Sequence, residues 1–266
     1  MDLYRAVKRR RSIRNYPDEV LSKEKFEKIR QLLETPPVFQ EEFSIGSRVI
    51  RDGHAFQGSL SGIIADYGKV EAPHYLVLTT GDRPGSYVEI GYRYEFVVLA
   101  LTAMGIGTCW IGKGFTDDEL KGYVDLPPGQ SCRALIAFGP VPEKELGIIE
   151  EPKRKELDTF LVDDGTSELD EDTIKIIDAL RRAPSSINSQ PWRVLVREGL
   201  LHLYIKSRTF ITKKLLTSLS LMNRIDAGIG LSHLEVAGKH FWDETNCKKL
   251  DHRRKKGLEY IASLSK

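Results

Sequence analysis

The 266-residue sequence contains only three cysteines, which are too few and too scattered for a disulfide framework. Cys109, Cys132 and Cys247 lie far apart and are odd in number. Such thiols are typical of a reducing compartment, so we expect a cytoplasmic protein with three buried, unreactive cysteines. The six histidines show no ligand spacing with any cysteine, so we expect no metal site.

Long apolar runs and a strong net charge are also missing. No apolar segment reaches the roughly 18 residues that a membrane-spanning helix needs. The N-terminal segment MDLYRAVKRRRSIR has no apolar stretch behind its charges, so it does not resemble a secretory signal. The formal net charge of +2 gives no overall field that would attract nucleic acid. Neither GxxxxGK followed by Ser or Thr nor GxGxxG occurs, so the common nucleotide-binding loops are absent.

Apolar periodicity predicts a mixture of helices and strands. Phe26, Ile29, Leu32 and Leu33 recur at helical spacing after the N-cap residue Ser22, and two prolines end this helix. Residues 37–71 read as hairpins and loops. The remaining expected elements are strands at 74–80, 106–112 and 132–141, a buried helix at 87–105, a short helix at 117–124, a linker at 143–172, helices at 170–182 and 224–242, a hairpin at 192–205 and a basic helical tail.

Two segments of the first half recur in the second. LSKEKFEKIRQLLETPP from Leu21 aligns with LDEDTIKIIDALRRAPS from Leu169, and EIG at 89–91 in the first long helix aligns with DAG at 226–228 in the second. The alignment pairs Phe26 with Ile174, Ile29 with Ile177, Leu32 with Leu180 and Pro36 with Pro184. Any two amphipathic helices give some matches, but two matches in the same order favour a duplicated unit.

Three polar segments are candidates for ligand binding. RRRSIR at 9–14 offers guanidinium forks and a hydroxyl suited to phosphate, or it is a solvated basic segment. PSSINSQP at 184–191 offers small donors and acceptors for the edge of a planar ring, or it caps the preceding helix. The glycines of GIGTCWIGKGF at 105–115 would let the backbone approach a flat ligand closely, and PKRK at 152–155 could bind a phosphate.

Taken together, the motifs RRRSIRNY, APSSINSQPW, MGIGTCWIG and ALIAFGPV with the KRK cluster resemble those of the FMN-dependent nitroreductases. The resemblance implies an α+β fold with antiparallel or mixed sheets flanked by helices. Members of this family are typically intertwined homodimers in which each flavin contacts both subunits. In the family the serine-rich segment closely follows the first helix. Here it follows the second copy of that helix, whereas the first copy is followed by TPPVFQEE.

This departure predicts a fused pseudo-dimer of two related halves, residues 1–157 and 158–266, which pack as one unit. Because neither a second arginine segment nor a second serine-rich segment exists, we expect one FMN per chain and a monomer. The resemblance assigns FMN contacts to Arg10, Arg11, Ser12, Arg14, Ile111, Gly112, Lys113, Lys153, Arg154, Pro184, Ser185, Ser186 and Asn188. Arg14 would support negative charge at flavin N1 and O2, and no side chain would act as acid or base.

The implied function is hydride transfer from NAD(P)H through FMN N5 to an electron-poor small molecule such as a nitroaromatic or a quinone. A non-catalytic flavin- or ligand-binding protein on the same fold is the alternative. A nucleic-acid-binding protein using RRRSIR and HRRKKG is disfavoured, because the chain is nearly neutral and lacks interleaved aromatic residues. We expect no membrane partner.

Overall fold

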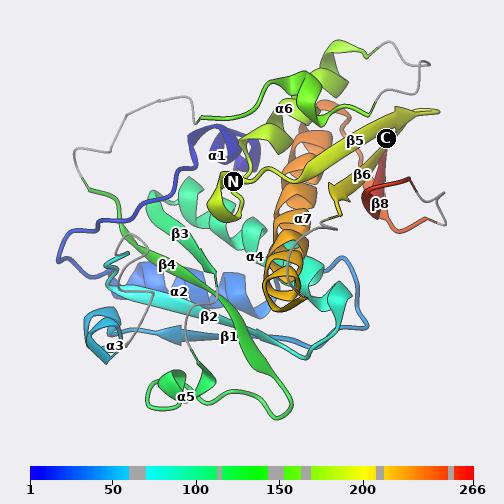
Figure 1. Ribbon diagram of the computed structural model, residues 1–266. Helices are drawn as coiled ribbons and strands as arrows, with labels where there is room; N and C mark the ends of the chain where they lie inside the picture. Colours follow the sequence, from blue (N-terminus) through cyan, green and yellow to red (C-terminus); the bar gives the residue numbers. More distant parts are fainter. Residues whose placement is uncertain (60–69, 113–115, 143–152, 163–168, 208–212, 251–254) are drawn as a thin grey trace.

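The computed structural model describes residues 1–59, 70–112, 116–142, 153–162, 169–207, 213–250 and 255–266 (Figure 1). The fold is α+β and consists of two four-stranded antiparallel sheets flanked by helices. The predicted fold class is therefore confirmed.

The first sheet belongs to the N-terminal part of the chain. Its strands are arranged in the order β1-β2-β4-β3, and every neighbouring pair is antiparallel. The elements are α1 (Leu3–Arg9), α2 (Lys23–Glu34), β1 (Ile45–Ile50), α3 (Gly53–Ser59), β2 (His74–Thr80), α4 (Pro84–Ala103), β3 (Ile106–Gly112), α5 (Asp117–Leu120) and β4 (Ser131–Pro140).

The second sheet belongs to the C-terminal part and has the order β5-β6-β8-β7, again antiparallel throughout. The elements are η3 (Leu157–Phe160), α6 (Glu171–Arg182), η4 (Ser186–Asn188), β5 (Trp192–Arg197), β6 (Leu200–Lys206), α7 (Lys213–Phe241), β7 (Asn246–Lys248) and β8 (Leu258–Ser265). In both parts a helix is followed by two strands, a long helix and two more strands, and the fourth strand lies between the second and the third.

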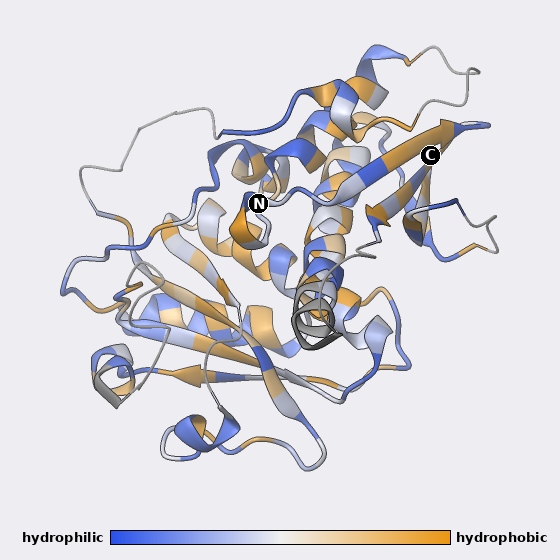
Figure 2. Cartoon of the chain, in the orientation of Figure 1, coloured by the Kyte–Doolittle hydropathy of each residue, from blue (hydrophilic) through white to orange (hydrophobic). Residues whose placement is uncertain are grey.

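The long helices α4 and α7 form the centre of the molecule. They pack against each other, with α4 on the first sheet and α7 on the second (Figure 1). Most of α4 is buried, as its apolar sequence predicted, and apolar residues are frequent along it and along the strands in Figure 2. At the crossing, a Cβ added at Gly91 would overlap the Ile225 carbonyl, and one added at Gly228 would overlap the Val88 carbonyl. Only glycine allows the two backbones to approach so closely.

Several local predictions are confirmed. Ser22 caps α2, where its hydroxyl accepts from the Lys25 N–H. The hairpin of β5 and β6 turns at Glu198 and Gly199, which both have positive φ as a tight two-residue turn requires. Cys109 and Cys132 are buried as expected, whereas Cys247 is partly exposed, and all three are free thiols.

Four expectations were wrong. The basic C-terminal tail forms β7 and β8 rather than a helix, because pairing of β8 with β6 and of β7 with β8 overrides its local composition. Residues 53–59, read as part of a hairpin and loop region, form α3. Within the expected linker, η3 buries Phe160 completely. The helical spacing placed Ile174 on one face with Ile177 and Leu180, but Ile174 is 39% exposed, because α6 packs through Thr173, Ile176, Ile177 and Leu180.

In the described part of the chain, no helix is both long enough and apolar enough to cross a membrane. The same residues contain no cluster of three or more His, Cys, Asp or Glu side chains that could hold a metal ion.

Candidate functional site

The arginine segment runs along the free edge of β3. Ser12 forms a parallel bridge with Thr108, and the Ile13 N–H donates to the Thr108 carbonyl at 2.9 Å. The Ile13 side chain packs so closely on Gly107 that a methyl group there would lie 2.9 Å from it. The strand edge therefore fixes the direction of residues 10–14, which follow directly on α1.

Arg10 points into the protein and is only 8% exposed. Its Nε lies 3.9 Å from Glu95 Oε1, too far for a hydrogen bond, and none of the described residues accepts from it. Burial lowers the pKa of Arg10, and the Glu95 carboxylate partly offsets this effect. A buried guanidinium with an unpartnered N–H is unfavourable unless an acceptor reaches it.

Glu95 connects the arginine segment to three other elements. The indole Nε1 of Trp110 in β3 donates to Glu95 Oε2 at 2.7 Å, and His233 Nε2 of α7 lies 2.8 Å from Oε1. His233 Nδ1 faces the Ala179 carbonyl of α6 at 2.9 Å. Both ring nitrogens of His233 therefore face oxygen atoms, so the ring joins the Glu95 carboxylate of α4 to the end of α6.

The serine-rich segment is anchored by a carboxylate of α7. Both Asp226 oxygens accept from the Ser186 N–H, at 3.0 and 3.2 Å, and the Asp226 carbonyl accepts from Trp192 Nε1 at 2.7 Å. The Gln190 N–H donates to Ser185 Oγ at 3.0 Å. Ile187, Asn188 and Gln190 all have positive φ, so side-chain contacts hold this backbone in a sparsely populated conformation.

The KRK cluster packs on the serine-rich segment. Arg154 Nη1 donates to Asn188 Oδ1 at 2.9 Å, and Asn188 Nδ2 donates back to the Lys153 carbonyl at 3.0 Å. Arg154 Nη2 also donates to the Arg182 carbonyl at the end of α6. The Lys155 N–H donates to Gln190 Oε1 at 2.9 Å.

Arg154 and Arg10 share two features. The Nε atoms of Arg154 and Arg10 are both buried, and neither has a hydrogen-bond partner in the part of the chain that the structure describes. Burial, together with the positive charges of Arg10, Arg181 and Arg182, lowers the pKa of Arg154 to about 10. The two guanidinium groups therefore lie within electrostatic reach of each other, although they come from opposite ends of the first 160 residues. Two such cations with free donors form a site suited to an anion.

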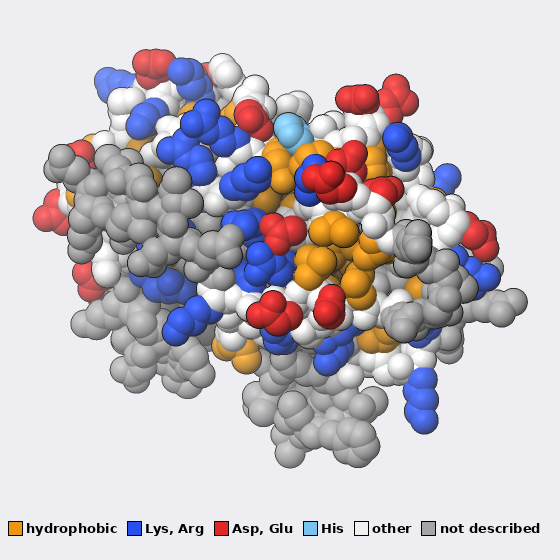
Figure 3. Space-filling view, turned by 90° about the horizontal axis from the view of Figure 1, so that it is seen from above, with side chains coloured by type: hydrophobic (Ala, Val, Ile, Leu, Met, Phe, Trp, Pro, Cys, Tyr) orange, Lys and Arg blue, Asp and Glu red, His pale blue; other side chains and the backbone are white. Residues whose placement is uncertain are grey.

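The other predicted residues lie around this centre. Arg14 is exposed and its Nη1 donates weakly to the Ser12 carbonyl at 3.5 Å. Ile111 and Gly112 end β3, Pro184 is buried beneath the serine-rich segment, and Arg11 and Ser12 are partly exposed. Lys113 lies outside the described residues. Figure 3 views the molecule from the side of α1 and α6 and shows Lys and Arg side chains gathered on that face beside an apolar patch.

One side chain links the end of β3 to the serine-rich segment. The Met222 methyl group of α7 lies against Gly112, where an added Cβ would overlap it. The Ser186 hydroxyl contacts Met222 Sδ at 3.6 Å. Gly112 and Ser186, predicted to meet opposite parts of a flavin ring, therefore share a neighbour.

Glu95, His233, Asp226 and Met222 were missed as site residues from the sequence. A carboxylate in the middle of the otherwise apolar helix α4 is a signal that could have identified Glu95. Asp226 was noticed only as the counterpart of Glu89 in the repeat. Met222 carries no signal, because a methionine in a helix is usually a core residue.

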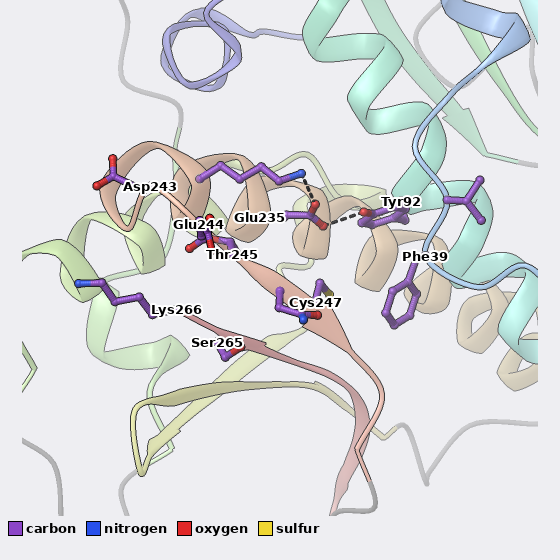
Figure 4. A pocket seen from close by; sticks show the side chains of 12 residues that line it. Phe39, Tyr92, Glu235, Asp243, Glu244, Thr245, Cys247, Ser265 and Lys266 are labelled. Carbon is purple, nitrogen blue, oxygen red and sulfur yellow. Dashed lines mark hydrogen bonds and ion pairs between the residues drawn. The ribbon is translucent and has the colours of Figure 1, made fainter.

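A pocket of about 730 Å³ lies elsewhere, between the end of α7 and strands β7 and β8 (Figure 4). Its lining includes none of the predicted site residues. It contains three carboxylates, those of Glu235, Asp243 and Glu244, and Glu235 accepts from the Tyr92 hydroxyl at 2.7 Å and from Lys239 at 2.6 Å. The chemistry of this pocket is therefore unlike that of the arginine site.

Comparison with known proteins identifies the class. The sequence profile of the family described as "Putative TM nitroreductase" matches residues 2–238. The chain belongs to this nitroreductase family. No curated protein matches its sequence.

One solved structure shares the fold along nearly the whole chain, and others match part of it. A crystal structure of a "putative nitroreductase" from Thermotoga maritima is 21% identical, with a TM-score of 0.66 over 99% of this chain and 93% of that one. A nitroreductase from Parabacteroides distasonis, described as a "putative NADH dehydrogenase/NAD(P)H nitroreductase", is 18% identical and covers 62% of this chain and 99% of its own, with a TM-score of 0.49. An FMN-dependent nitroreductase from Clostridium difficile is 20% identical and covers 53% and 93%, with a TM-score of 0.43.

Proposed function

We propose that the chain binds one FMN and uses it to transfer hydride from NAD(P)H to an electron-poor small molecule such as a nitroaromatic or a quinone. The observation that carries the proposal is the pair of guanidinium groups of Arg10, which is buried, and Arg154, which is partly buried, each with a buried Nε that has no hydrogen-bond partner among the described residues. Membership of a nitroreductase family supplies the reaction class.

The charges around Arg10 fit a phosphate. The Glu95 carboxylate lies 3.9 Å from Arg10 Nε and is also contacted by Trp110 Nε1 and His233 Nε2, so it compensates the buried guanidinium only in part. The partners of Arg154 among the described residues are the neutral oxygens of Lys153, Arg182 and Asn188. A dianionic phosphate would accept from both Nε groups and compensate both charges.

The flavin ring would lie next to this phosphate site. When bound, FMN supplies hydride transfer at N5 between NAD(P)H and the acceptor. Arg14 would place positive charge near N1 and O2, and Ile111, Gly112 and Lys113 would meet the ring near N5. Pro184, Ser185, Ser186 and Asn188 would line its other edge, while Lys153, Arg11 and Ser12 would complete the phosphate surroundings.

One flavin per chain is proposed because the described residues of the two halves, 1–157 and 158–266, offer only one such site. The matching strand order of the two sheets favours a duplicated unit that packs as a monomeric pseudo-dimer. Glu89 accepts from the Phe39 and Gln40 N–H groups after α2, much as Asp226 accepts from the Ser186 N–H after α6.

The corresponding place in the other half is unsuited to a phosphate. That place is formed by the segment after α2, which includes Phe39, and by α7 and β7. These elements line the pocket of Figure 4. An anion there would meet the carboxylates of Glu235, Asp243 and Glu244, against which the lining offers two lysines, Lys239, which is paired with Glu235, and Lys266. The three free thiols also fit the reducing cytoplasm proposed for the chain.

The first experiment is a titration with FMN and, in parallel, with riboflavin, which lacks the phosphate. We expect saturation at one FMN per chain. Arg154→Ala should weaken FMN binding by about tenfold or more and leave riboflavin binding unchanged. Arg197→Ala, at the exposed end of β5, is the matched control and should change neither.

Turnover separates the enzyme from a non-catalytic binder. The FMN-loaded protein is reduced anaerobically with NADPH or NADH and then mixed with a nitroaromatic or a quinone. Rapid reoxidation supports the enzyme, whereas reduction without reoxidation favours the binding protein. Two FMN per chain would contradict the assignment of the halves, and no binding of FMN would overturn the whole proposal.

A further inference from the structure

Met222 of α7 stands between the two walls of the proposed ring site. Its methyl group lies against Gly112, the last residue of β3, and its sulfur contacts the Ser186 hydroxyl at 3.6 Å. Gly112 and Ser186 come from different halves of the chain, and among the described residues Met222 is the side chain that the structure places in contact with both.

The position of Met222 is fixed by its own helix. Asp226 lies one turn further along α7 and accepts from the Ser186 N–H. Residues four apart share a helix face, so α7 presents the Asp226 carboxylate and the Met222 thioether side by side to the same serine. Asp226 holds the backbone of Ser186, and Met222 takes up the space in front of its side chain.

The side chain itself is suited to move. Met222 is only partly buried, and methionine has three rotatable bonds and no polar group that would lose a strong hydrogen bond. By contrast, the backbone of Gly112 is held in β3 by pairing with Ala134. A planar ring entering between Gly112 and Ser186 would therefore displace the thioether rather than the strand.

We propose that Met222 is a displaceable gate of the flavin site, whose side chain occupies the space of the ring and leaves it when the ring binds. This inference rests on the proposed function. It makes Met222 a determinant of flavin affinity and, in the loaded protein, of the size of acceptor that can approach the ring beside Gly112.

The chain is well suited to a direct test, because it contains only three methionines, Met1, Met104 and Met222. Protein labelled with ¹³C in the methionine methyl groups gives three resonances, which Met222→Ala and Met104→Ala assign. Adding FMN should shift the Met222 resonance strongly and leave that of Met104, at the opposite end of β3, in place.

Affinity provides the second readout. Met222→Ala should bind FMN about fivefold more tightly than the wild type, because no rotamer-rich side chain has to be displaced. Met222→Leu, which keeps the bulk, should stay close to the wild type, and Met222→Phe should bind more weakly. Met104→Ala, which shortens a partly buried methionine away from the site, is the matched control and should not change the affinity.

The outcomes separate two kinds of failure. If FMN binds all variants equally and the Met222 resonance stays in place, the gate is wrong and the proposed function is untouched. If FMN binds neither the wild type nor Met222→Ala, the proposed function itself is overturned, and the gate falls with it. A shifted Met222 resonance together with tighter binding by Met222→Ala would support the gate.

Discussion

Gly91 of α4 and Gly228 of α7 occupy equivalent places on the two central helices, each against the backbone of the other. Gly91 faces the Ile225 carbonyl, three residues before Gly228, and Gly228 faces the Val88 carbonyl, three residues before Gly91. Such reciprocity is what a twofold-related pair of helices produces. Together with the matching strand order of the sheets, it explains why EIG and DAG align in the sequence.

The reciprocal glycines lead to the first prediction. Gly91→Ala and Gly228→Ala should each destabilise the protein by about 1–3 kcal/mol or more, because the added methyl meets backbone that cannot give way. Urea denaturation measures the effect. Gly122→Ala, where an added Cβ meets nothing within 4 Å, is the control and should be close to neutral. Equal stability of all three variants would mean that the helices can separate freely.

Glu95 provides the second prediction. Glu95→Gln keeps the shape of the side chain but removes the carboxylate that lies beside both Arg10 and His233. Breaking a buried ion pair by neutralising one partner costs about 3–5 kcal/mol, so the variant should unfold at markedly lower urea concentration. Glu27→Gln on the exposed face of α2 is the control.

A double-mutant cycle shows whether the two groups act together. His233→Asn alone should also destabilise, and Glu95→Gln combined with His233→Asn should cost less than the sum of the two single changes. Additive effects would contradict a shared network. Added phosphate should stabilise the wild type more than Glu95→Gln if Glu95 positions Arg10 for an anion.

Local patterns predicted the parts of the fold that depend on neighbouring residues. The cap at Ser22, the tight turn at Glu198 and Gly199 and the apolar helix α4 follow from a few adjacent side chains. The C-terminal strands were missed because β8 is stabilised by β6, about 55 residues earlier, and not by its own composition.

The candidate site also has one part that sequence motifs predict and one part that they do not. Arg10, Arg154 and Asn188 could be named because their segments carry family motifs, and the structure brings Arg154 and Asn188 into direct contact. Glu95 and Asp226 act on those segments from the middle of α4 and α7. Which face of a buried helix points to a loop depends on packing of the whole chain, so sequence periodicity could not assign them.

Asp178 predicts a pH dependence of stability. Burial opposes its ionisation, but hydrogen bonds from Arg182 and Arg181 hold its pKa below the usual value. The pKa is therefore lower in the folded than in the unfolded chain, so the ionised group stabilises the fold above the unfolded pKa of about 4. This contribution is lost as the pH falls through the lower folded pKa.

The measurement for Asp178 is urea denaturation of Asp178→Asn and wild type between pH 7 and pH 3. At pH 7 the variant should be less stable by up to about 1 kcal/mol, since the pair is partly exposed to solvent. The difference should shrink below pH 4. Asp118→Asn, in an exposed pair on α5, is the control. A difference that stays constant at every pH would show that charge is not its cause.

Ile187 leads to the last prediction, because this β-branched residue has a left-handed backbone conformation. It has φ of 49° and ψ of 26° within η4, and its side chain is 73% exposed. A β-branched residue is strained by about 1–2 kcal/mol in this left-handed conformation, and an exposed side chain recovers little of that by burial. Ile187→Asn should therefore raise the stability by several tenths of a kcal/mol to about 1 kcal/mol, since asparagine tolerates positive φ.

Urea denaturation and FMN affinity together show why an isoleucine is present there. Ile174→Asn, an exposed isoleucine in the regular helix α6, is the control and should not gain stability. If Ile187→Asn is more stable but binds FMN or its acceptor less well, the strain is kept because the apolar side chain contributes to ligand binding at the rim of the site. If it is no more stable than the wild type, the backbone of the serine-rich segment is not strained at Ile187, and the contacts of Asn188 and Gln190 alone determine its shape.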